Sequence, residues 1–233
     1  MGGYAMSGKG RGLGIAAVVV GLVGLLSGLG GLAYARYAFG GSVVSSDSMT
    51  PTYGPGDRIF YERIDGSDVR RGDVVVFSAP DRYGFDALVM ERVIGVGGDH
   101  VTCCTGAGAK TRVLVNGRPL QEPYLKSPED SRGFGVASYD VSVPEGRLFM
   151  LGDHRANARD ARAFLDDQGG TLAESVIRGR VIEDVTVPAV LGTAMVLGVL
   201  LVPVGVGLGI AAVVVRRRAR AAVAPPPPWA VQG

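Results

Sequence analysis

The stretch Ala87-Leu88-Val89-Met90-Glu91-Arg92-Val93-Ile94-Gly95 is the longest of several short runs of β-forming residues in this sequence. Similar runs, set apart by Gly, Pro and Asp, occupy Arg58–Glu62, Asp73–Phe77, Arg112–Val115, Ser138–Val143 and Arg147–Leu151. Strands at this spacing, with turn residues between them, favour an antiparallel sheet or barrel. Val115-Asn116-Gly117-Arg118 adds a hairpin signal, because Asn-Gly tolerates the positive φ of a type I′ turn. Since helical periodicity is weak in this part of the chain, we predict a mainly β domain.

Two uncharged segments bracket these runs. Gly12–Ala35 (GLGIAAVVVGLVGLLSGLGGLAYA) supplies 24 residues, and about 20 are needed to cross roughly 30 Å of hydrocarbon. Its glycines suit a membrane helix, because they let neighbouring helices approach closely. Ala33-Tyr34-Ala35 also resembles the small-x-small cleavage site of a secretory signal peptide, an alternative that the length of the apolar run disfavours. The second run, 185–215, is predicted to contain another spanning helix.

Basic residues flank the outer end of each predicted span. Lys9 and Arg11 precede the first, and Arg216-Arg217-Arg218-Ala219-Arg220 follows the second at once. Lys and Arg concentrate on the cytoplasmic side of membrane segments, so we expect both termini in the cytosol. The predicted organisation is a cytosolic N-terminus (1–11), a transmembrane helix (12–35), an extracytoplasmic β domain (36–184), a second transmembrane helix (185–215) and a basic, then Pro-rich cytosolic tail (216–233).

The charge distribution and the hydrophobic content each exclude one broad class of protein. The 233 residues include 24 Lys and Arg against 22 Asp and Glu, a net charge of +2. Six of the basic residues lie outside 36–184, which leaves 18 bases against 22 acids in the predicted β domain. A nucleic-acid-binding domain would need a basic patch there. A disordered chain is excluded because 47% of the residues are hydrophobic.

Few residues in the chain are suited to metal binding or redox chemistry. Cys103 and Cys104 are adjacent, and His100 and His154 are the only histidines. No zinc-type spacing is present, so we predict no metal, and the absence of a Gly-rich phosphate loop leaves a nucleotide site unsupported. An outward location permits oxidation, so a vicinal disulfide and two buried thiols are both compatible with a structural role for the cysteines.

The hydroxyl-rich segment Ser45-Ser46-Asp47-Ser48-Met49-Thr50-Pro51-Thr52 follows the first predicted span. Alone it would be interpreted as a surface loop shaped by Pro and Gly. Three further motifs follow in order: Gly72–Phe77 (GDVVVF), Glu91–Asp99 (ERVIGVGGD) and Gly152–Arg162 (GDHRANARDAR). This ordered set resembles the type I signal peptidases, membrane-anchored serine proteases, and is most similar to the enzymes of Gram-positive actinobacteria. The resemblance covers about 36–184 and the first anchor, and implies a mainly β signal-peptidase-type domain between two transmembrane helices.

The resemblance assigns roles to particular residues. It implies that Ser48 is the nucleophile, and that Ser46 and the Ser48 backbone N–H form the oxyanion hole. Met49 and Met90 would line a cleft for small substrate side chains, although Met49 is equally compatible with core packing. A serine hydroxyl is a weak nucleophile that needs a nearby base, and donors aimed at the developing oxyanion lower the barrier. Three more residues are expected to support the site, with a salt bridge or hydrogen bonds between the last two: Asp153, Asp160 and Arg162.

The sequence departs from the family pattern at the base. The family has a lysine immediately before Arg-Val-Ile-Gly, with its pKa lowered by apolar surroundings, and this chain has Glu91 there. The family usually has a serine that orients the lysine, at the position of Ala158 here. The base of the family and the serine that orients it are therefore both replaced in this chain.

Three hypotheses follow from this departure. In the first, Glu91 is the base, because burial can raise a carboxyl pKa from about 4.3 to about 8–9. In the second, a histidine is the base, and His154 is a better candidate than His100. In the third, the chain keeps the peptide groove without catalysis and binds signal peptides or assists an active peptidase.

The resemblance also implies a substrate, partners and a location. We expect a signal peptidase I in the cell membrane that cuts exported precursors after a small-x-small sequence without a cofactor. The expected partners are secreted precursors with their signal peptides and the lipid bilayer, and the secretion translocon is a further candidate. Nucleic acid is not expected.

Overall fold

The computed structural model describes residues 5–105, 112–125, 138–184 and 186–222. The chain divides into two compact units: residues 38–183 form one, and the segments before and after them form the other. Val185 and the end of the predicted tail, residues 223–233, lie outside the described residues.

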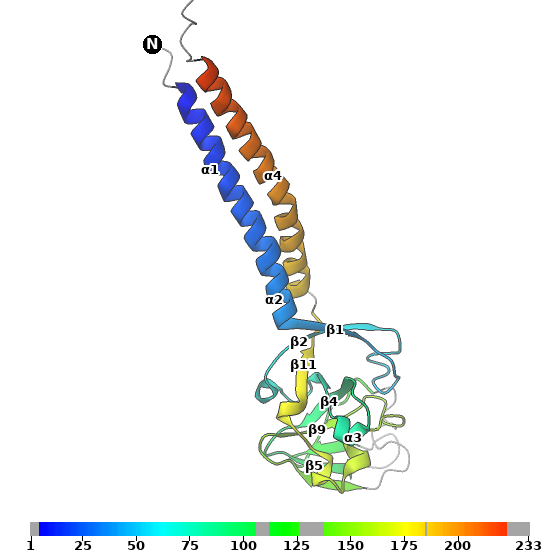
Figure 1. Cartoon of the computed structure of the whole chain (residues 1–233). Helices are drawn as coiled ribbons and strands as arrows, with labels where there is room; N and C mark the ends of the chain where they lie inside the picture. Colours follow the sequence, from blue (N-terminus) through cyan, green and yellow to red (C-terminus); the bar gives the residue numbers. More distant parts are fainter. Residues whose placement is uncertain (1–4, 106–111, 126–137, 185, 223–233) are drawn as a thin grey trace, which may run out of the picture. The chain divides into compact units, whose positions relative to one another are not determined.

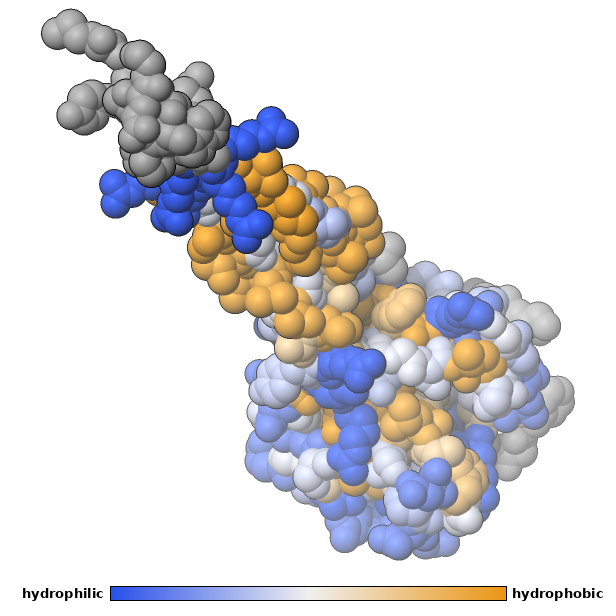
Figure 2. Space-filling model, turned by 45° about the horizontal axis from the view of Figure 1, so that its top comes forward, coloured by the Kyte–Doolittle hydropathy of each residue, from blue (hydrophilic) through white to orange (hydrophobic). Residues whose placement is uncertain are grey.

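The first unit is helical. It contains α1 (Ala5–Leu25), a π-helical turn η1 (Leu26–Gly30), α2 (Gly31–Ala38) and α4 (Thr186–Ala222), and α1 and α4 lie side by side (Figure 1). By length and composition, residues 11–38 and 186–220 could each cross a membrane. Apolar side chains cover most of the visible surface of the helix pair (Figure 2). The described residues of both runs predicted to span a membrane are thus helical. The first helical segment extends beyond the predicted run at both ends, and the second extends beyond it at the C-terminal end.

Glycines allow the two long helices to pack closely. A Cβ on Gly24 would lie 2.8 Å from the carbonyl oxygen of Gly198, and a Cβ on Gly198 would lie 2.6 Å from the backbone nitrogen of Gly28. Any larger residue at these positions would force the helices apart. Small residues permit this kind of close approach between membrane helices.

The second unit consists of antiparallel strands in two sheets, and the mainly β, antiparallel prediction is confirmed. The larger sheet has the strand order β1 (Phe39–Val43), β2 (Arg58–Glu62), β11 (Ile177–Val181), β3 (Val74–Phe77), β4 (Val89–Gly95), β9 (Arg147–Leu151), β10 (Leu172–Ala173). The smaller sheet has the order β7 (Arg118–Pro119), β6 (Arg112–Val115), β5 (His100–Thr105), β8 (Tyr139–Ser142). Short helices connect them: η2 (Gly66–Asp68), α3 (Pro80–Tyr83), η5 (Ala161–Phe164), η6 (Gln168–Gly170) and η7 (Glu174–Val176).

The predicted hairpin joins β6 to β7. Asn116 and Gly117 both have positive φ angles, 53° and 73°, as a type I′ turn requires. Leu114 pairs with Pro119 and Val115 with Arg118 across it. The hairpin prediction is therefore confirmed at the level of backbone geometry.

The central strands are buried on both faces. Side chains alternate between the faces of a strand, so Val75 and Phe77 of β3 enter one apolar cluster while Val74 and Val76 enter another. This two-sided burial explains why the sequence of β3 is continuously apolar and not alternating. It also separates two faces of β4, one carrying Met90 and the other carrying Glu91 beside Tyr83.

Candidate functional site

Ser46 and Ser48 lie on a turn between β1 and β2. Their hydroxyl oxygens are 3.0 Å apart, within hydrogen-bonding distance. Met49, the next residue, has no exposed surface and packs in the cluster that includes Val74 and Val76. The buried methionine thus anchors the turn, and the two hydroxyls remain on its outer side. Met90 packs against the same cluster and is partly exposed. Met49 has no surface with which to line a cleft, so the prediction that it does is wrong and the core packing that the sequence also allowed is found.

The last of the four motifs, Gly152–Arg162, is hydrogen-bonded to the backbone of this turn. The backbone N–H of His154 donates to the carbonyl oxygen of Ser48 (2.9 Å). A Cβ on Gly152 would lie 2.7 Å from that same oxygen and would also contact the methyl group of Ala158. Only glycine therefore allows the motif to approach the backbone of Ser48 so closely.

The ring of His154 contacts the turn at a different place. Its Nδ1 lies 3.1 Å from the carbonyl oxygen of Asp47 and 3.2 Å from the Thr50 hydroxyl. Among the described residues, no hydrogen bond joins this ring to the Ser48 hydroxyl. His154 is thus brought to the predicted site, where its contacts hold the turn.

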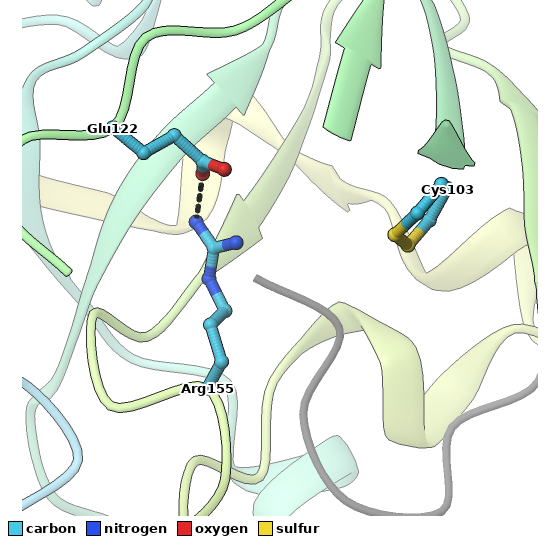
Figure 3. The surroundings of a disulfide bond; sticks show 4 residues. Cys103, Glu122 and Arg155 are labelled. Atoms are coloured by element: carbon cyan, nitrogen blue, oxygen red, sulfur yellow. Dashed lines mark hydrogen bonds and ion pairs between the residues drawn. A yellow bond between two sulfur atoms is a disulfide. The ribbon is translucent and has the colours of Figure 1, made fainter. Parts of the chain in front are cut away.

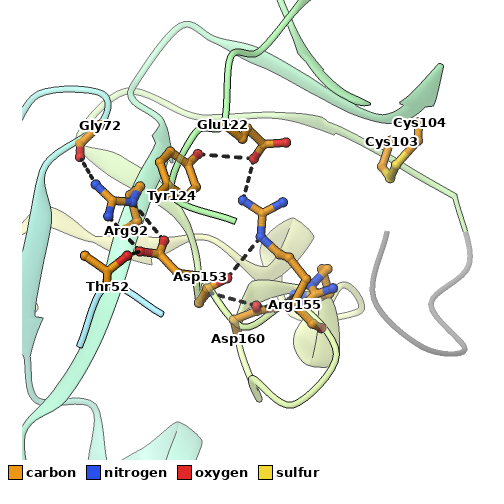
Figure 4. Close-up of polar contacts among 12 residues, drawn as sticks. Thr52, Gly72, Arg92, Cys103, Cys104, Glu122, Tyr124, Asp153, Arg155 and Asp160 are labelled. Carbon is orange, nitrogen blue, oxygen red and sulfur yellow. Dashed lines mark hydrogen bonds and ion pairs between the residues drawn. A yellow bond between two sulfur atoms is a disulfide. The ribbon is translucent and has the colours of Figure 1, made fainter. Parts of the chain in front are cut away.

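Asp153 connects the turn to β4. It has no exposed surface and accepts hydrogen bonds from Arg92 through both carboxylate oxygens (2.8 and 2.7 Å) and from the Thr52 hydroxyl (2.5 Å). Arg92 also donates to the carbonyl oxygen of Gly72 (2.9 Å), as Figure 4 shows. The Asp153 carboxylate and the Arg92 guanidinium together therefore join all four sequence motifs.

Asp160 and Arg162 form a buried ion pair. Arg162 donates through Nε and Nη2 to the two carboxylate oxygens of Asp160 (2.8 and 2.7 Å). Arg162 is 7% exposed and Asp160 is 0% exposed. Asp160 also accepts from the backbone N–H of Gly152 (3.0 Å). The contact expected between these two residues is therefore a buried ion pair.

Glu91 lies in β4, one residue before Arg92, and Arg92 pairs with Leu151. Because the strands are antiparallel, Glu91 lies across from Gly152, the residue that follows β9. The side chain of Glu91 is 3% exposed and accepts a hydrogen bond from the Tyr83 hydroxyl (2.8 Å). Burial, and next the nearby charge of Asp160, raise the pKa of the Glu91 carboxyl well above its ordinary value.

A third buried ion pair, between Arg155 and Glu122, was not predicted from the sequence. Arg155 Nη2 lies 2.5 Å from Glu122 Oε1, and both side chains are almost completely buried, as Figure 3 shows. Glu122 also accepts from the Tyr124 hydroxyl (3.1 Å), and the Arg92 guanidinium lies 4.1 Å from the centre of the Tyr124 ring. Arg155 Nε donates to the carbonyl oxygen of Gly152 (3.0 Å). This network joins the segment after β7 to the motif that supports Ser48.

Cys103 and Cys104 form a vicinal disulfide in β5 (Figure 3), one of the two states that the sequence left open. Neither residue takes part in the hydrogen bonds around Ser48 in the described part of the chain. Within that part, no group of three or more His, Cys, Asp or Glu side chains could hold a metal ion.

Comparisons with known proteins agree with this geometry. The family described as "Signal peptidase, peptidase S26" matches residues 15–185. The chain therefore belongs to the peptidase S26 family of signal peptidases. It is 34% identical over 137 residues to "Signal peptidase I" of Leptolyngbya laminosa, a match that covers 56% of this chain and 60% of that protein. It is 32% identical over 135 residues to "Signal peptidase I S" of Bacillus subtilis (strain 168), covering 54% of this chain and 68% of that protein.

A solved signal peptidase I from Enterococcus faecalis V583 matches 49% of this chain and 97% of its own chain, with 24% identity and a TM-score of 0.38. The chain spans less than two thirds of the length of several of the relatives it matches, 60% in Leptolyngbya laminosa and 54% in Mycobacterium leprae.

Proposed function

We propose that the chain is a membrane-anchored signal peptidase I, a serine endopeptidase that removes signal peptides from exported precursors after a small-x-small sequence. The observation that carries the proposal is the turn with Ser46 and Ser48. Its two hydroxyls are 3.0 Å apart, and its backbone is held by Met49 on one side and by the N–H of His154 on the other. A nucleophile works best when its supports hold it in one position.

In the proposed reaction, Ser48 Oγ attacks the scissile carbonyl carbon and gives up its proton to a base. The backbone N–H of Ser48 and the Ser46 hydroxyl stabilise the developing oxyanion. The C–N bond then breaks, the amine leaves with the proton, and water hydrolyses the acyl-enzyme ester. Met90, which is partly exposed, supplies apolar surface for small substrate side chains, and the buried Met49 holds the turn that carries Ser48. Asp153, Asp160 and Arg162 position the surrounding loops without touching the reacting atoms.

We propose Glu91 as the base, in place of the lysine of related enzymes. An ordinary carboxylate is a weak base near neutral pH, but the burial of Glu91 and the charge of Asp160 raise its pKa toward the working range. His154 stays the alternative base: its Nδ1 contacts the Asp47 carbonyl and the Thr50 hydroxyl, which leaves Nε2 as the nitrogen that would accept a proton.

The helical unit supports a membrane location. We propose that residues 12–35 and 185–215 span the bilayer, that residues 1–11 and 216–233 are cytosolic, and that residues 36–184 lie outside, as in enzymes of the actinobacterial type. The chain from Ala38 to Ser48 can extend no more than about 35 Å, so Ser48 stays close to the membrane surface. Precursors, lipid and the translocon are the proposed partners.

A second candidate function is a binding module without catalysis. It is favoured by the contacts of Glu91, which is hydrogen-bonded to Tyr83, and by those of Ser48, which is hydrogen-bonded to Ser46. In the described part of the chain, no hydrogen bond joins Ser48 to Glu91. Such a protein would hold a signal peptide against Met90 and leave it intact.

Cleavage of a labelled small-x-small precursor by the full chain in detergent separates the two functions. We expect Ser48→Ala to abolish cleavage, and Ser45→Ala, which changes an exposed serine three residues earlier in the same turn, to leave the rate unchanged. Equal rates for native and Ser48→Ala chains would contradict a serine peptidase. Precursor binding without cleavage in both chains would establish the binding module.

A further inference from the structure

Tyr83 is held rigidly at the end of α3. The helix ends at Gly84, which has a φ of 79°. The tyrosine ring is 9% exposed, and its centre lies 5.9 Å from Phe77, 5.9 Å from Phe85 and 5.5 Å from Phe164. Aromatic side chains packed from three directions fix the ring and therefore the direction of its hydroxyl.

This hydroxyl is aimed at Glu91. It lies 2.8 Å from Glu91 Oε1 and, in the described part of the chain, it is the only hydrogen-bonding partner of that carboxyl group. Ala158, where related enzymes have an orienting hydroxyl, carries only a methyl group, which leaves no room for a Cβ on Gly152. Glu91 would therefore have no orienting donor if Tyr83 were absent.

We propose that Tyr83 is the positioning residue for Glu91: the Tyr83 hydroxyl orients the Glu91 carboxylate and stabilises the ionised form that accepts the proton of Ser48. This inference rests on the proposed function. It also explains how a carboxyl group could work where related enzymes have an amine. Burial drives a lysine toward its neutral, basic form, but it drives a carboxyl group toward the neutral form that cannot accept a proton. A hydrogen bond to the carboxylate opposes that effect of burial.

The charged and titratable groups that face Glu91 come from two other elements. Asp160, just before η5, raises the pKa of Glu91, whereas Tyr83, Arg162 and Arg82 lower it. Burial, and then the nearby Glu91 carboxylate, raise the pKa of Tyr83 above its ordinary value. The phenol therefore stays protonated and remains a donor throughout the range in which Glu91 titrates.

Tyr83→Phe tests the proposal, because it keeps the ring and removes only the donor. The first readout is the titration of the Glu91 side-chain carboxyl carbon by ¹³C NMR on the full chain, assigned by comparison with Glu91→Gln. We expect the midpoint to rise by about one pH unit in Tyr83→Phe, equivalent to about 1.4 kcal/mol. The second readout is the pH midpoint of kcat/KM, which should rise by the same amount while kcat falls.

Tyr139→Phe is the matched control. Tyr139 is 5% exposed, and its buried hydroxyl has no hydrogen-bonding partner among the described residues, so its loss should leave the titration of Glu91 unchanged. A Glu91 midpoint that is the same in Tyr83→Phe and in the native chain would overturn the proposal, as would faster cleavage by Tyr83→Phe. If no Ser48-dependent cleavage is found, the proposed function fails on that result, and the NMR titration still decides whether Tyr83 controls the protonation of Glu91.

Discussion

Single residues in the β unit differ widely in how strongly their protonation is linked to the fold. Asp99 follows β4 and accepts hydrogen bonds from Arg71 Nη2 (2.6 Å), the backbone N–H of Val96 (2.9 Å) and Asn116 Nδ2 (2.8 Å). Burial alone would raise its pKa, but these hydrogen bonds lower the pKa of Asp99 below its ordinary value. One carboxylate thereby joins the larger sheet to the β6–β7 hairpin.

The stability that Asp99 contributes should disappear in acid. Because its folded-state pKa is depressed, the contribution is complete above the unfolded-state pKa, near 3.9, and is lost as the pH falls through the lower folded-state value. We expect Asp99→Asn to lower the free energy of unfolding by about 1–3 kcal/mol at pH 7 and by less at pH 3, where the unfolded-state carboxyl is largely protonated.

Thermal unfolding of the full chain in detergent at the two pH values would measure this difference. The control is Asp140→Asn, since the Asp140 side chain is 76% exposed in its pair with His100 and should contribute little at either pH. A constant difference between Asp99→Asn and the native chain at pH 7 and pH 3 would show that ionisation of Asp99 is not the cause.

Among the elements, the segment from Leu120 to Leu125, which follows β7, supplies one side of a buried ion pair near the site. Glu122 and Arg155 are paired where neither can reach water, and removing one partner of a buried pair leaves the other charge uncompensated. The Glu122–Arg155 pair (Figure 4) holds Gly152 through Arg155 Nε, so its loss should also loosen the support of the Ser48 backbone.

We expect Glu122→Gln to destabilise the full chain by about 3–5 kcal/mol, the usual cost of breaking a buried ion pair. Asp167→Asn is the matched control, because it breaks an ion pair with Arg82 in which the Asp167 side chain is 62% exposed, and such pairs are worth about 0–1 kcal/mol. The comparison is made by denaturant unfolding in detergent. Similar losses in the two variants would mean that the Glu122–Arg155 pair contributes no more than an exposed one.

The sequence predicted the elements whose signals are local. β2, β6 and β9 begin and end at the predicted residues, because each is a run of β-forming residues bounded by turn residues. β11 was missed, since Arg178, Gly179 and Arg180 interrupt its apolar positions, and its place between β2 and β3 depends on pairing with residues far away in the sequence. β1 was missed because its two glycines carry no strand signal.

Site residues could likewise be predicted only where a local sequence motif carries them. Ser46, Ser48, Asp153 and Asp160 could be predicted because ordered motifs carry them, although their catalytic roles stay predictions. Tyr83 could not, since its role depends on a contact between α3 and the buried face of β4. Glu122, Tyr124 and Arg155 form contacts between loops distant in the sequence, which no local pattern indicates.

At the scale of the whole molecule, the two units have different sources of stability. The helix pair exposes apolar side chains over most of its length, a surface that is favourable only in lipid or detergent. The β unit has three apolar clusters of its own and several buried charges, each paired with an opposite charge or hydrogen-bonded. Activity should therefore be measured on the full chain in detergent or vesicles.

The most direct test of the central claim, that Ser48 works with Glu91 as its base, is the pH dependence of precursor cleavage by the native chain and by Glu91→Gln and Glu91→Lys. The raised pKa of Glu91 means that its ionised, basic form is populated only at higher pH. We predict that native kcat/KM rises with pH through a midpoint above the ordinary glutamate range, and that Glu91→Gln loses about 10²–10⁴-fold, the usual contribution of a general base. An unchanged rate in Glu91→Gln, or a silent native chain with activity appearing only in Glu91→Lys, would contradict the claim.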